Sequence, residues 1–566
     1  MSAVLFALPL ALYVLTATRT VQGGDTGELA VVGAAGGVPH PPGYPLYTLL
    51  ARVCGALPWG PPAWRVALLS ALCAAAAVAV LERALYRVSG SRLASAGAAL
   101  AFAVAPIQWR LAGVPEVFAL HALCAALVLL AAIRLADAPT EEGRLAALAL
   151  GGALGLGLAN HHTIVLLAPL PLWGVLAYGR RAGRRRGAAA AALAAGGALA
   201  GVALYAVLPL LARDGAWVWG DPGTPGGLVD HVLRREYGTL QLGLSPAARR
   251  PLEHVGAFLA SLPRGFFYLY FAAGLVGLAA VWRRRGLAIA LVAALLLAGV
   301  AFPAWFNLPR TPVAAEVAAR FHLLPTLLFA VAVAAGLAAI ARRLSPLAAR
   351  LLVLAPLACA ALATYGQADW RGDPTIERFL VAAVREAAPD AIILGQGDLE
   401  LFGFTYVREG LRQRPDLHFV DVNLLRRRWY HARITRVVPG LALPFDPTVT
   451  RLGAVIDAAA ARGPVYLTRS LAADARGVAL YPEGLLARVL PASAAAPPPA
   501  ALTEAAERAL AALHGLPPRP VDAWSALARS QAAGALAPLV DALARTGDPA
   551  RAGALRKRLD ELAPSD

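Results

Sequence analysis

The sequence predicts a polytopic α-helical membrane protein with a soluble α/β domain at its C-terminal end. Apolar residues make up 58% of the 566 positions and charged residues only 15%, against about 25% charged residues in a soluble domain. Residues 1–366 consist of helix-length apolar stretches that are separated by arginine clusters. The acidic residues follow a different distribution, because 13 precede Gln367 and 22 follow from there on. We therefore expect a transmembrane domain over 1–366 and a soluble domain over 367–566.

The transmembrane domain is predicted to contain about eleven membrane-spanning helices. A helix needs roughly 20 apolar residues to cross the hydrocarbon core, with about 17 as a lower bound. The four cysteines lie in or beside apolar stretches and lack the spacing of metal ligands, so no metal site is predicted. The stretches that fit are 3–18, 63–82, 93–109, 117–133, 145–161, 163–179, 188–211, 265–282, 286–303, 323–341 and 350–366.

The basic residues predict how these helices are oriented. Alternate connections, among them 180–186 and 283–285, hold 16 basic and 4 acidic residues, whereas the opposite set holds 12 and 9. Positively charged loops stay on the cytoplasmic side, so the first set is expected inside. Most of the net charge of +17 then reflects orientation in a membrane, and it no longer argues for a nucleic-acid partner. The outside loops are 19–62, 110–116, 212–264 and 304–322, and eleven helices place the C-terminal domain outside as well.

The C-terminal domain shows a mixed pattern of strands and helices. Residues 390–395 and 417–422 read as strands around a helix at 399–410, which is one βαβ unit. A further strand is expected at 463–468. Residues 486–502 are rich in Ala and Pro and indicate a linker, and 503–563 read as helical.

The sequence GDTGE at 24–28 is the first candidate for chemistry. Asp25 and Glu28 are three residues apart, so on a helix they share one face. The same spacing is that of a capping box, with Asp25 as N-cap and Glu28 as its partner. Acidic residues are scarce in the outside loops, and ionisable groups at a membrane are costly and usually functional. These two carboxylates are therefore candidate catalytic groups.

The sequence HPPGYP at 40–45 follows in the same loop. Each proline fixes φ and removes a backbone donor, so the segment is stiff and cannot be a regular helix. It is either a rigid turn that returns the chain to the membrane or a preorganised wall of a ligand-binding site. The second interpretation makes His40 and Tyr44 ligands of a sugar or a phosphate.

The remaining outward loops add further candidates. Arg110 and Glu116 are flanked by apolar residues. In one interpretation Arg110 anchors the chain at the membrane interface and Glu116 is an acid at a helix start. In the other, they are a cation and a third carboxylate that face the same cavity as Asp25. His121 ends this stretch and is predicted to bind substrate. Arg320 is either an anchor that reaches the membrane surface or a clamp for a lipid-linked phosphate.

Three polar residues at the next outward helix end are expected to line the substrate cavity. They are Asn160, His161 and His162. Adjacent histidines point about 100° apart on a helix, so a shared metal is disfavoured.

Four segments, taken in order, resemble a known family. They are GDTGE (24–28), VPHPPGYPLY (38–47), PEVFALH (115–121) and GLANHHT (157–163). Together they are similar to a bacterial membrane family, formerly of unknown function, that is related to protein O-mannosyltransferases of the glycosyltransferase C (GT-C) superfamily. The resemblance implies a GT-C-like fold in a bacterial inner membrane, so the C-terminal domain that eleven helices place outside is expected in the periplasm.

The resemblance also implies an activity. It is the inverting transfer of a mannose-like sugar from a polyprenyl-phosphate donor to a protein or glycan acceptor, most simply a protein Ser or Thr hydroxyl. By position Asp25 is then the base, with Glu28 and Glu116 in support. No cofactor beyond the lipid-linked donor is implied. Two other classes stay open on the residues alone, namely a transporter or flippase of lipid-linked sugars and a membrane scaffold.

Overall fold

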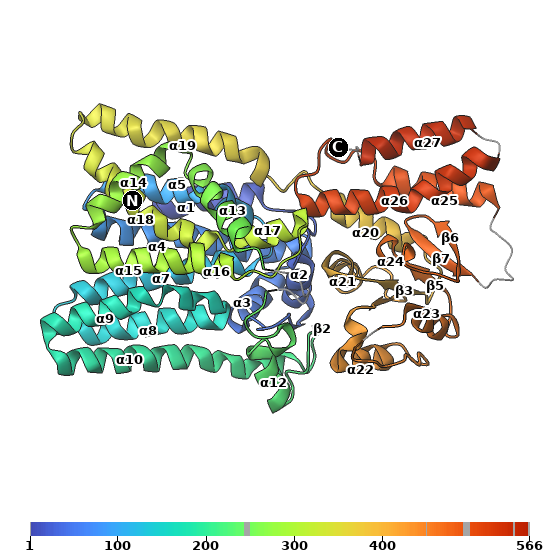
Figure 1. Cartoon of the computed structure of the whole chain (residues 1–566), viewed down its shortest axis with the longest axis horizontal. Coiled ribbons are helices and arrows are strands. Elements are labelled where there is room, and N and C mark those ends of the chain that lie inside the picture. Colours follow the sequence, from blue (N-terminus) through green and yellow to red (C-terminus); the bar gives the residue numbers. More distant parts are fainter. Residues whose placement is uncertain (1, 243–248, 449, 491–497, 547–548, 564–566) are drawn as a thin grey trace.

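The computed structural model describes residues 2–242, 249–448, 450–490, 498–546 and 549–563. The N-terminal helices form a bundle, and the C-terminal part lies against one end of that bundle (Figure 1). The helices of the bundle are α1 (Ser2–Thr16), α4 (Pro62–Ser89), α5 (Arg92–Ala103), α6 (Pro106–Ala112), α7 (Val117–Asp137), α8 (Gly143–Asn160), α9 (Pro169–Ala182), α10 (Arg184–Val202), α13 (Pro251–Gly265), α14 (Leu269–Val281), α15 (Arg285–Leu296), α18 (Leu323–Ala341) and α19 (Pro346–Ala368).

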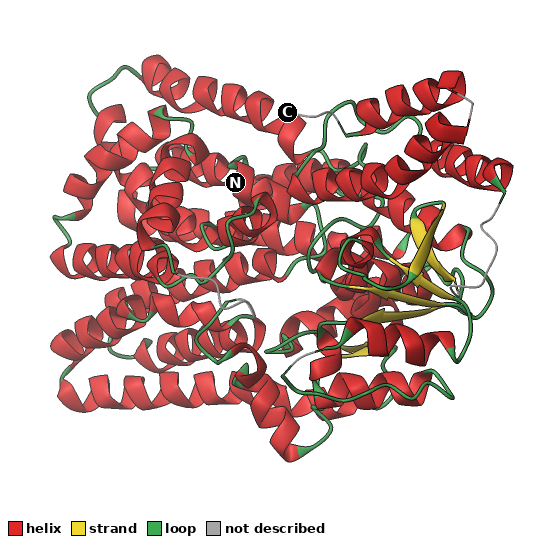
Figure 2. Ribbon diagram, turned by 45° about the vertical axis from the view of Figure 1, so that its right-hand side comes forward, coloured by secondary structure: helices red, strands yellow, loops and turns green. Residues whose placement is uncertain are grey.

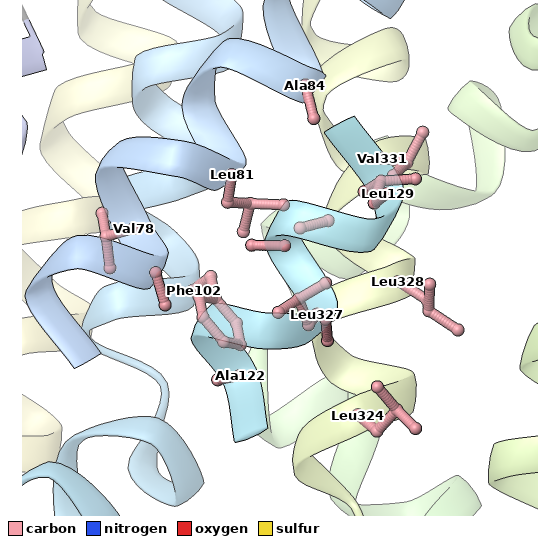
Figure 3. Close-up of a cluster of buried hydrophobic side chains, with 14 of the residues drawn as sticks. Val78, Leu81, Ala84, Phe102, Ala122, Leu129, Leu324, Leu327, Leu328 and Val331 are labelled. Atoms are coloured by element: carbon pink, nitrogen blue, oxygen red, sulfur yellow. The ribbon is translucent and has the colours of Figure 1, made fainter. Parts of the chain in front are cut away.

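The interior of the bundle is an apolar core between α4, α5, α7 and α18. Leu81, Phe102, Leu129 and Leu327 are each fully buried there, and their side chains point toward one another from four helices (Figure 3). Burial of a large apolar side chain contributes about 1.5–3 kcal/mol relative to exposure to water. This core holds α7 and α18, which begin directly after Glu116 and three residues after Arg320.

The structure bears out a multi-span helical protein but not the count of eleven. Within the described residues, seven helices are long and apolar enough to cross a membrane, or eight if the pair α13 and α14 is one span bent by 105°. Three of the other expected spans are short or broken. The first, 3–18, is the helix α1 with only 15 residues. The second, 93–109, ends as α5 at Ala103. The third, 163–179, begins as a 3-10 helix over His162–Leu167. Prolines at 106 and 169 restart the chain at two of these breaks.

Short elements cover the end of the bundle that faces the C-terminal part. These elements are α2 (Thr26–Ala35), β1 (Gly37–Val38), α3 (Pro45–Gly55), β2 (Trp217–Val218), α12 (Pro225–Val232), α16 (Phe302–Ala304) and α17 (Pro312–Arg320). The strands β1 and β2 pair in parallel and so join residues that lie far apart in the sequence.

The C-terminal part is built on a five-stranded sheet with the order β4-β3-β5-β7-β6. The strand β3 is parallel to both of its neighbours, whereas β7 is antiparallel to β5 and to β6. Helices surround the strands (Figure 2). The strands are β3 (Ile392–Gly395), β4 (His418–Asp421), β5 (Val465–Leu467), β6 (Ala479–Glu483) and β7 (Leu486–Leu490), and the helices are α20 (Thr375–Arg385), α21 (Asp398–Thr405), α22 (Arg428–Val437), α23 (Leu452–Ala460), α24 (Arg469–Ala472), α25 (Pro499–Ala512), α26 (Ala523–Thr546) and α27 (Pro549–Leu562).

Two expectations for this part need correction. The first residues of the expected linker at 486–502 form β7 instead, because Leu486 and Val489 pack into the apolar core of this part. Residues 491–497 of that linker lie outside the described residues. The strand β6 was missed as well. It is partly buried along its whole length, so it lacks the alternation by which a half-buried strand is recognised.

The apolar core of the C-terminal part continues into the short elements at the end of the bundle. Val31 of α2 and Trp217 of β2 belong to the same buried cluster as Leu394 of β3 and Phe402 of α21. The change in composition near Gln367 therefore does not separate two independent cores. The candidate site lies where these segments meet.

Candidate active site

Asp25 stands at the start of α2, but its side chain does not cap the helix. It is the N-cap residue by position and makes no side-chain bond to the helix backbone. Its Oδ2 instead accepts a hydrogen bond of 2.8 Å from Arg320 Nη1. The capping-box interpretation is therefore wrong for this pair. The carboxylate of Asp25 is 26% exposed, so a substrate can reach it.

Arg320 joins two carboxylates from distant parts of the chain. It is the last residue of α17, and its Nη1 lies 2.8 Å from Asp25 Oδ2 and 2.7 Å from Glu116 Oε1. Glu116 precedes α7 and is almost fully buried. A Cβ atom at Gly24 would lie 2.2 Å from Arg320 Nη2, so the missing side chain there lets the guanidinium approach.

The two carboxylates that contact Arg320 have pKa values shifted in opposite directions. Desolvation by burial acts to raise the pKa of Asp25, but the charges of His40 and Arg320 outweigh it and lower that pKa below its ordinary range. Burial raises the pKa of Glu116 to about 7 despite the nearby Arg320. At neutral pH Asp25 is thus the ionised carboxylate, and Glu116 is close to its titration midpoint.

Glu28, His40 and Tyr44 form a hydrogen-bonded chain beside Asp25. Glu28 Oε2 lies 2.5 Å from His40 Nδ1, and His40 Nε2 lies 2.8 Å from the hydroxyl of Tyr44. Glu28 Oε1 also accepts from the backbone N–H of His40 at 2.9 Å and from Trp217 Nε1 at 2.8 Å. Burial acts to lower the pKa of His40, but the carboxylates of Glu28 and Asp25 raise it to about 9.

Two cavities meet at Arg320. The Asp25 cavity has a volume of about 600 Å³, and Asp25, His40 and Tyr44 line it. The Glu116 cavity has a volume of about 580 Å³, and Glu116 and Arg110 line it. Arg320 lines both cavities, and so does Trp524 at the start of α26. A cation paired with two carboxylates therefore stands in the wall between two ligand-sized spaces.

The other residues singled out in the sequence are divided between these spaces and the surrounding core. His161 and His162 line the Asp25 cavity, and the ring of His161 stacks on Tyr44 at 5.9 Å. Arg110 lines only the Glu116 cavity, where its guanidinium lies 4.4 Å from the ring of Trp370.

Two more of these residues line neither cavity. Asn160 is buried and donates to the carbonyl of Val117 at 3.1 Å. His121 Nε2 lies 3.2 Å from the hydroxyl of Thr163. Glu28 likewise lies behind His40, outside both cavity walls.

Several lining residues are not among the predicted site residues. Arg234, Tyr237, Asp398, Phe402 and Trp524 all line the Asp25 cavity. Arg234 and Tyr237 come from a long loop without a regular pattern. Asp398 had a usable signal, because it lies three residues after a buried strand, and side chains at the carboxyl ends of parallel strands often bind ligands.

Among the described residues there is no group of three or more His, Cys, Asp or Glu side chains that could hold a metal ion. The carboxylates of Asp25, Glu116 and Glu28 are engaged by Arg320, His40 and Trp217.

Comparison with known proteins identifies relatives over most of the chain. Residues 25–184 match the family described as the Protein O-mannosyl-transferase TMEM260 N-terminal domain. The mouse protein named Protein O-mannosyl-transferase TMEM260 is 32% identical over 473 residues, which cover 79% of this chain and 66% of the mouse protein. The Dictyostelium discoideum protein named Protein O-mannosyl-transferase tmem260 is 28% identical over 286 residues, which cover 47% of this chain and 34% of that protein.

One solved structure has a similar fold. It is ArnT from Cupriavidus metallidurans bound to undecaprenyl phosphate, with a TM-score of 0.54 at 15% sequence identity. The match covers 88% of this chain and 99% of ArnT, so the likeness includes the C-terminal part. The resemblance found in the sequence is therefore confirmed: the chain is similar to the TMEM260 protein O-mannosyl-transferases and has a GT-C glycosyltransferase fold.

Proposed function

We propose that this protein is an inverting glycosyltransferase. It moves a mannose-like sugar from a polyprenyl-phosphate donor to the hydroxyl of a protein Ser or Thr residue. The names of the mouse and Dictyostelium relatives support the reaction, and the lipid phosphate bound by ArnT supports the class of donor.

The observation that carries the proposal is the group of Asp25, Arg320 and Glu116 in the wall between two cavities. An accessible carboxylate and a guanidinium are the two groups that such a transfer needs. The acceptor oxygen attacks the anomeric carbon while Asp25 takes the hydroxyl proton. The bond from that carbon to the phosphate oxygen breaks, and the phosphate leaves with the electron pair. Arg320 stabilises the charge that develops on it.

The other side chains act around this pair. Glu28 has both oxygens occupied by hydrogen bonds, so we infer that it positions His40 and Tyr44 rather than receiving the proton itself. Glu116 holds Arg320 in place from the buried side. Arg110, His161 and His162 contact substrate from the cavity walls. His121 and Asn160 support those walls from behind.

We also propose that the site faces the periplasm of a bacterial cell and that the protein spans the inner membrane. Residues 367–566 then form a soluble unit on the same outward side. The contacts of α21 with α2 and of α26 with α17 support this arrangement, because α2 and α17 belong to the loops expected outside.

The proposal is tested by mass spectrometry of exported proteins from a bacterial host that makes the chain. We expect hexose on Ser or Thr residues with the wild type and none with Asp25→Asn. Asp230→Asn is the matched control, since Asp230 is exposed and, among the described residues, its side chain pairs only with Arg235. Hexose that persists in Asp25→Asn would refute the assignment of the base. Redistribution of lipid-linked sugar across the membrane without any product would favour a transporter.

A further inference from the structure

The carboxyl edge of the C-terminal sheet opens onto the Asp25 cavity. The strand β3 ends at Gly395 and is flanked by two parallel neighbours, β4 and β5. The chain leaves β3 toward β4 on one side and returns to β5 on the other, which makes the end of β3 a topological switch point. Open α/β sheets bind ligands at that place. Asp398 lies three residues beyond the end of β3 and lines the Asp25 cavity.

The loop after β3 is held in one conformation by hydrogen bonds. The backbone N–H of Gln396 donates to Glu400 Oε2 at 2.8 Å. The backbone N–H of Gly397 donates to Asp421 Oδ2 at 2.9 Å. Gly397 has a φ of 88°, a left-handed conformation that favours glycine. The backbone that carries Asp398 is thus fixed before any substrate arrives.

The helix α21 is in turn docked on α2. A Cβ atom at Gly27 would lie 2.7 Å from the carbonyl oxygen of Phe402, so the two backbones are in close contact. The ring of Phe402 stacks on His40 with the centroids 6.5 Å apart. Asp398 therefore has a defined position relative to Asp25, because α21 contacts α2 although the two helices belong to different parts of the chain (Figure 1).

The carboxylate of Asp398 is unused within the described part of the chain. No hydrogen bond or ion pair joins it to another described residue. Asp398 is accessible, and it lines the Asp25 cavity. Desolvation in the cavity raises the pKa of Asp398 to about 7, and the charge of Asp25 acts in the same direction. Such a carboxyl group is suited to hydrogen bonds with neutral hydroxyls, as an acceptor when ionised and as a donor when protonated.

We propose that Asp398 binds a hydroxyl group of the donor sugar and so contributes to sugar selection. The inference rests on the proposed function. An acceptor Ser or Thr has one hydroxyl, and its proton goes to Asp25. A hexose keeps several further hydroxyls, and these are the groups that a second carboxylate in the same cavity can bind. Asp398 is then a specificity-determining residue supplied by the C-terminal part.

The test compares two lipids on the full-length protein in detergent, undecaprenyl-phosphate-mannose and sugar-free undecaprenyl phosphate. We expect Asp398→Ala to raise the Kd of the mannose lipid about tenfold, which is the effect of one hydrogen bond to a charged group. The Kd of the sugar-free lipid stays unchanged. Asp398→Asn keeps an acceptor oxygen and loses less affinity. Asp457→Ala is the control, because Asp457 is exposed on α23 and lines neither cavity.

Three results would overturn this inference. Unchanged binding of both lipids by Asp398→Ala would refute the contact between Asp398 and the sugar, while the proposal of a polyprenyl-phosphate donor would stand. Equal weakening of both lipids would assign Asp398 a structural role instead. Failure of the wild type to bind either lipid would refute the proposed donor, and the inference would fall with it.

Discussion

At the scale of single residues, the site depends on one guanidinium that serves two acids. Arg320 and Asp25 are 295 positions apart in the sequence, and both were singled out before their contact was known. The scarcity of acidic residues in the outward loops, which points to Asp25, could be read from the sequence. The pairing of Asp25 with Arg320 could not, because it depends on how α17 packs beside the start of α2. The same holds for Glu28, whose partner Trp217 lies 189 residues away.

Loss of Arg320 is expected to destabilise the protein through Glu116. Arg320→Ala leaves this buried carboxylate without its cation, and breaking a buried pair in this way costs about 3–5 kcal/mol. Since Glu116 is buried and has a raised pKa, the double variant Arg320→Ala with Glu116→Gln should recover part of the loss. Thermal unfolding in detergent measures both. Equal destabilisation of the single and the double variant would contradict the pairing.

His40 gives the stability of the protein a defined pH dependence. Its pKa is about 9 in the folded chain against an ordinary value of 6.5. The protonated form is therefore favoured by folding, so its contribution is complete below about pH 6.5 and is lost as the pH rises through 9. We expect the wild type to lose more stability than His40→Asn between these two pH values.

The pH dependence also tests the contact with Glu28. In Glu28→Gln, His40 loses the largest of the charges that raise its pKa, so this variant should resemble His40→Asn in its pH dependence. Melting temperatures at pH 6.5 and pH 9.5 give the comparison. A wild-type pH dependence in both variants would show that His40 is not charged in the fold.

At the scale of elements, the docking of α21 on α2 is the contact that completes the site. Gly27→Ala would place a methyl group 2.7 Å from the carbonyl oxygen of Phe402, so one backbone must move. We expect sugar transfer to fall at least tenfold and the melting temperature to drop, since overpacking costs about 1–3 kcal/mol. Gly453→Ala is the control, because its added methyl group meets nothing within 4 Å. Unchanged transfer in Gly27→Ala would separate the site from this contact.

Elements were predicted well where a simple apolar pattern fixed them. The helix α18 runs from Leu323 to Ala341, as expected from an uninterrupted apolar stretch. The strand β4 lies within its predicted range at His418–Asp421. The stretch 93–109 was read as one span because composition alone does not show that the chain turns at Val104 and restarts at Pro106. The docking of α21 on α2 depends on Gly27, and the sequence offered no sign of its partner.

At the scale of the whole molecule, the arrangement predicts which segments share one side of the membrane. The C-terminal part lies against the bundle end that carries α2 and α17 (Figure 1). Single cysteines at positions 310 and 553, in a chain whose four native cysteines are replaced, should react with an impermeant maleimide from the same side. A cysteine at position 184, within an arginine cluster, should react from the other side. Labelling of 553 and 184 from one side would refute this topology.

In the proposed reaction, Asp25 acts in the chemical step rather than in binding. The most direct measurement uses the purified protein with undecaprenyl-phosphate-mannose. It follows the Kd of the lipid alone and the release of undecaprenyl phosphate when a Ser- or Thr-containing acceptor peptide is added. We predict that Asp25→Asn binds the mannose lipid within a few-fold of the wild type and releases no undecaprenyl phosphate above background. Release of undecaprenyl phosphate at the wild-type rate by Asp25→Asn would show that Asp25 is not the base.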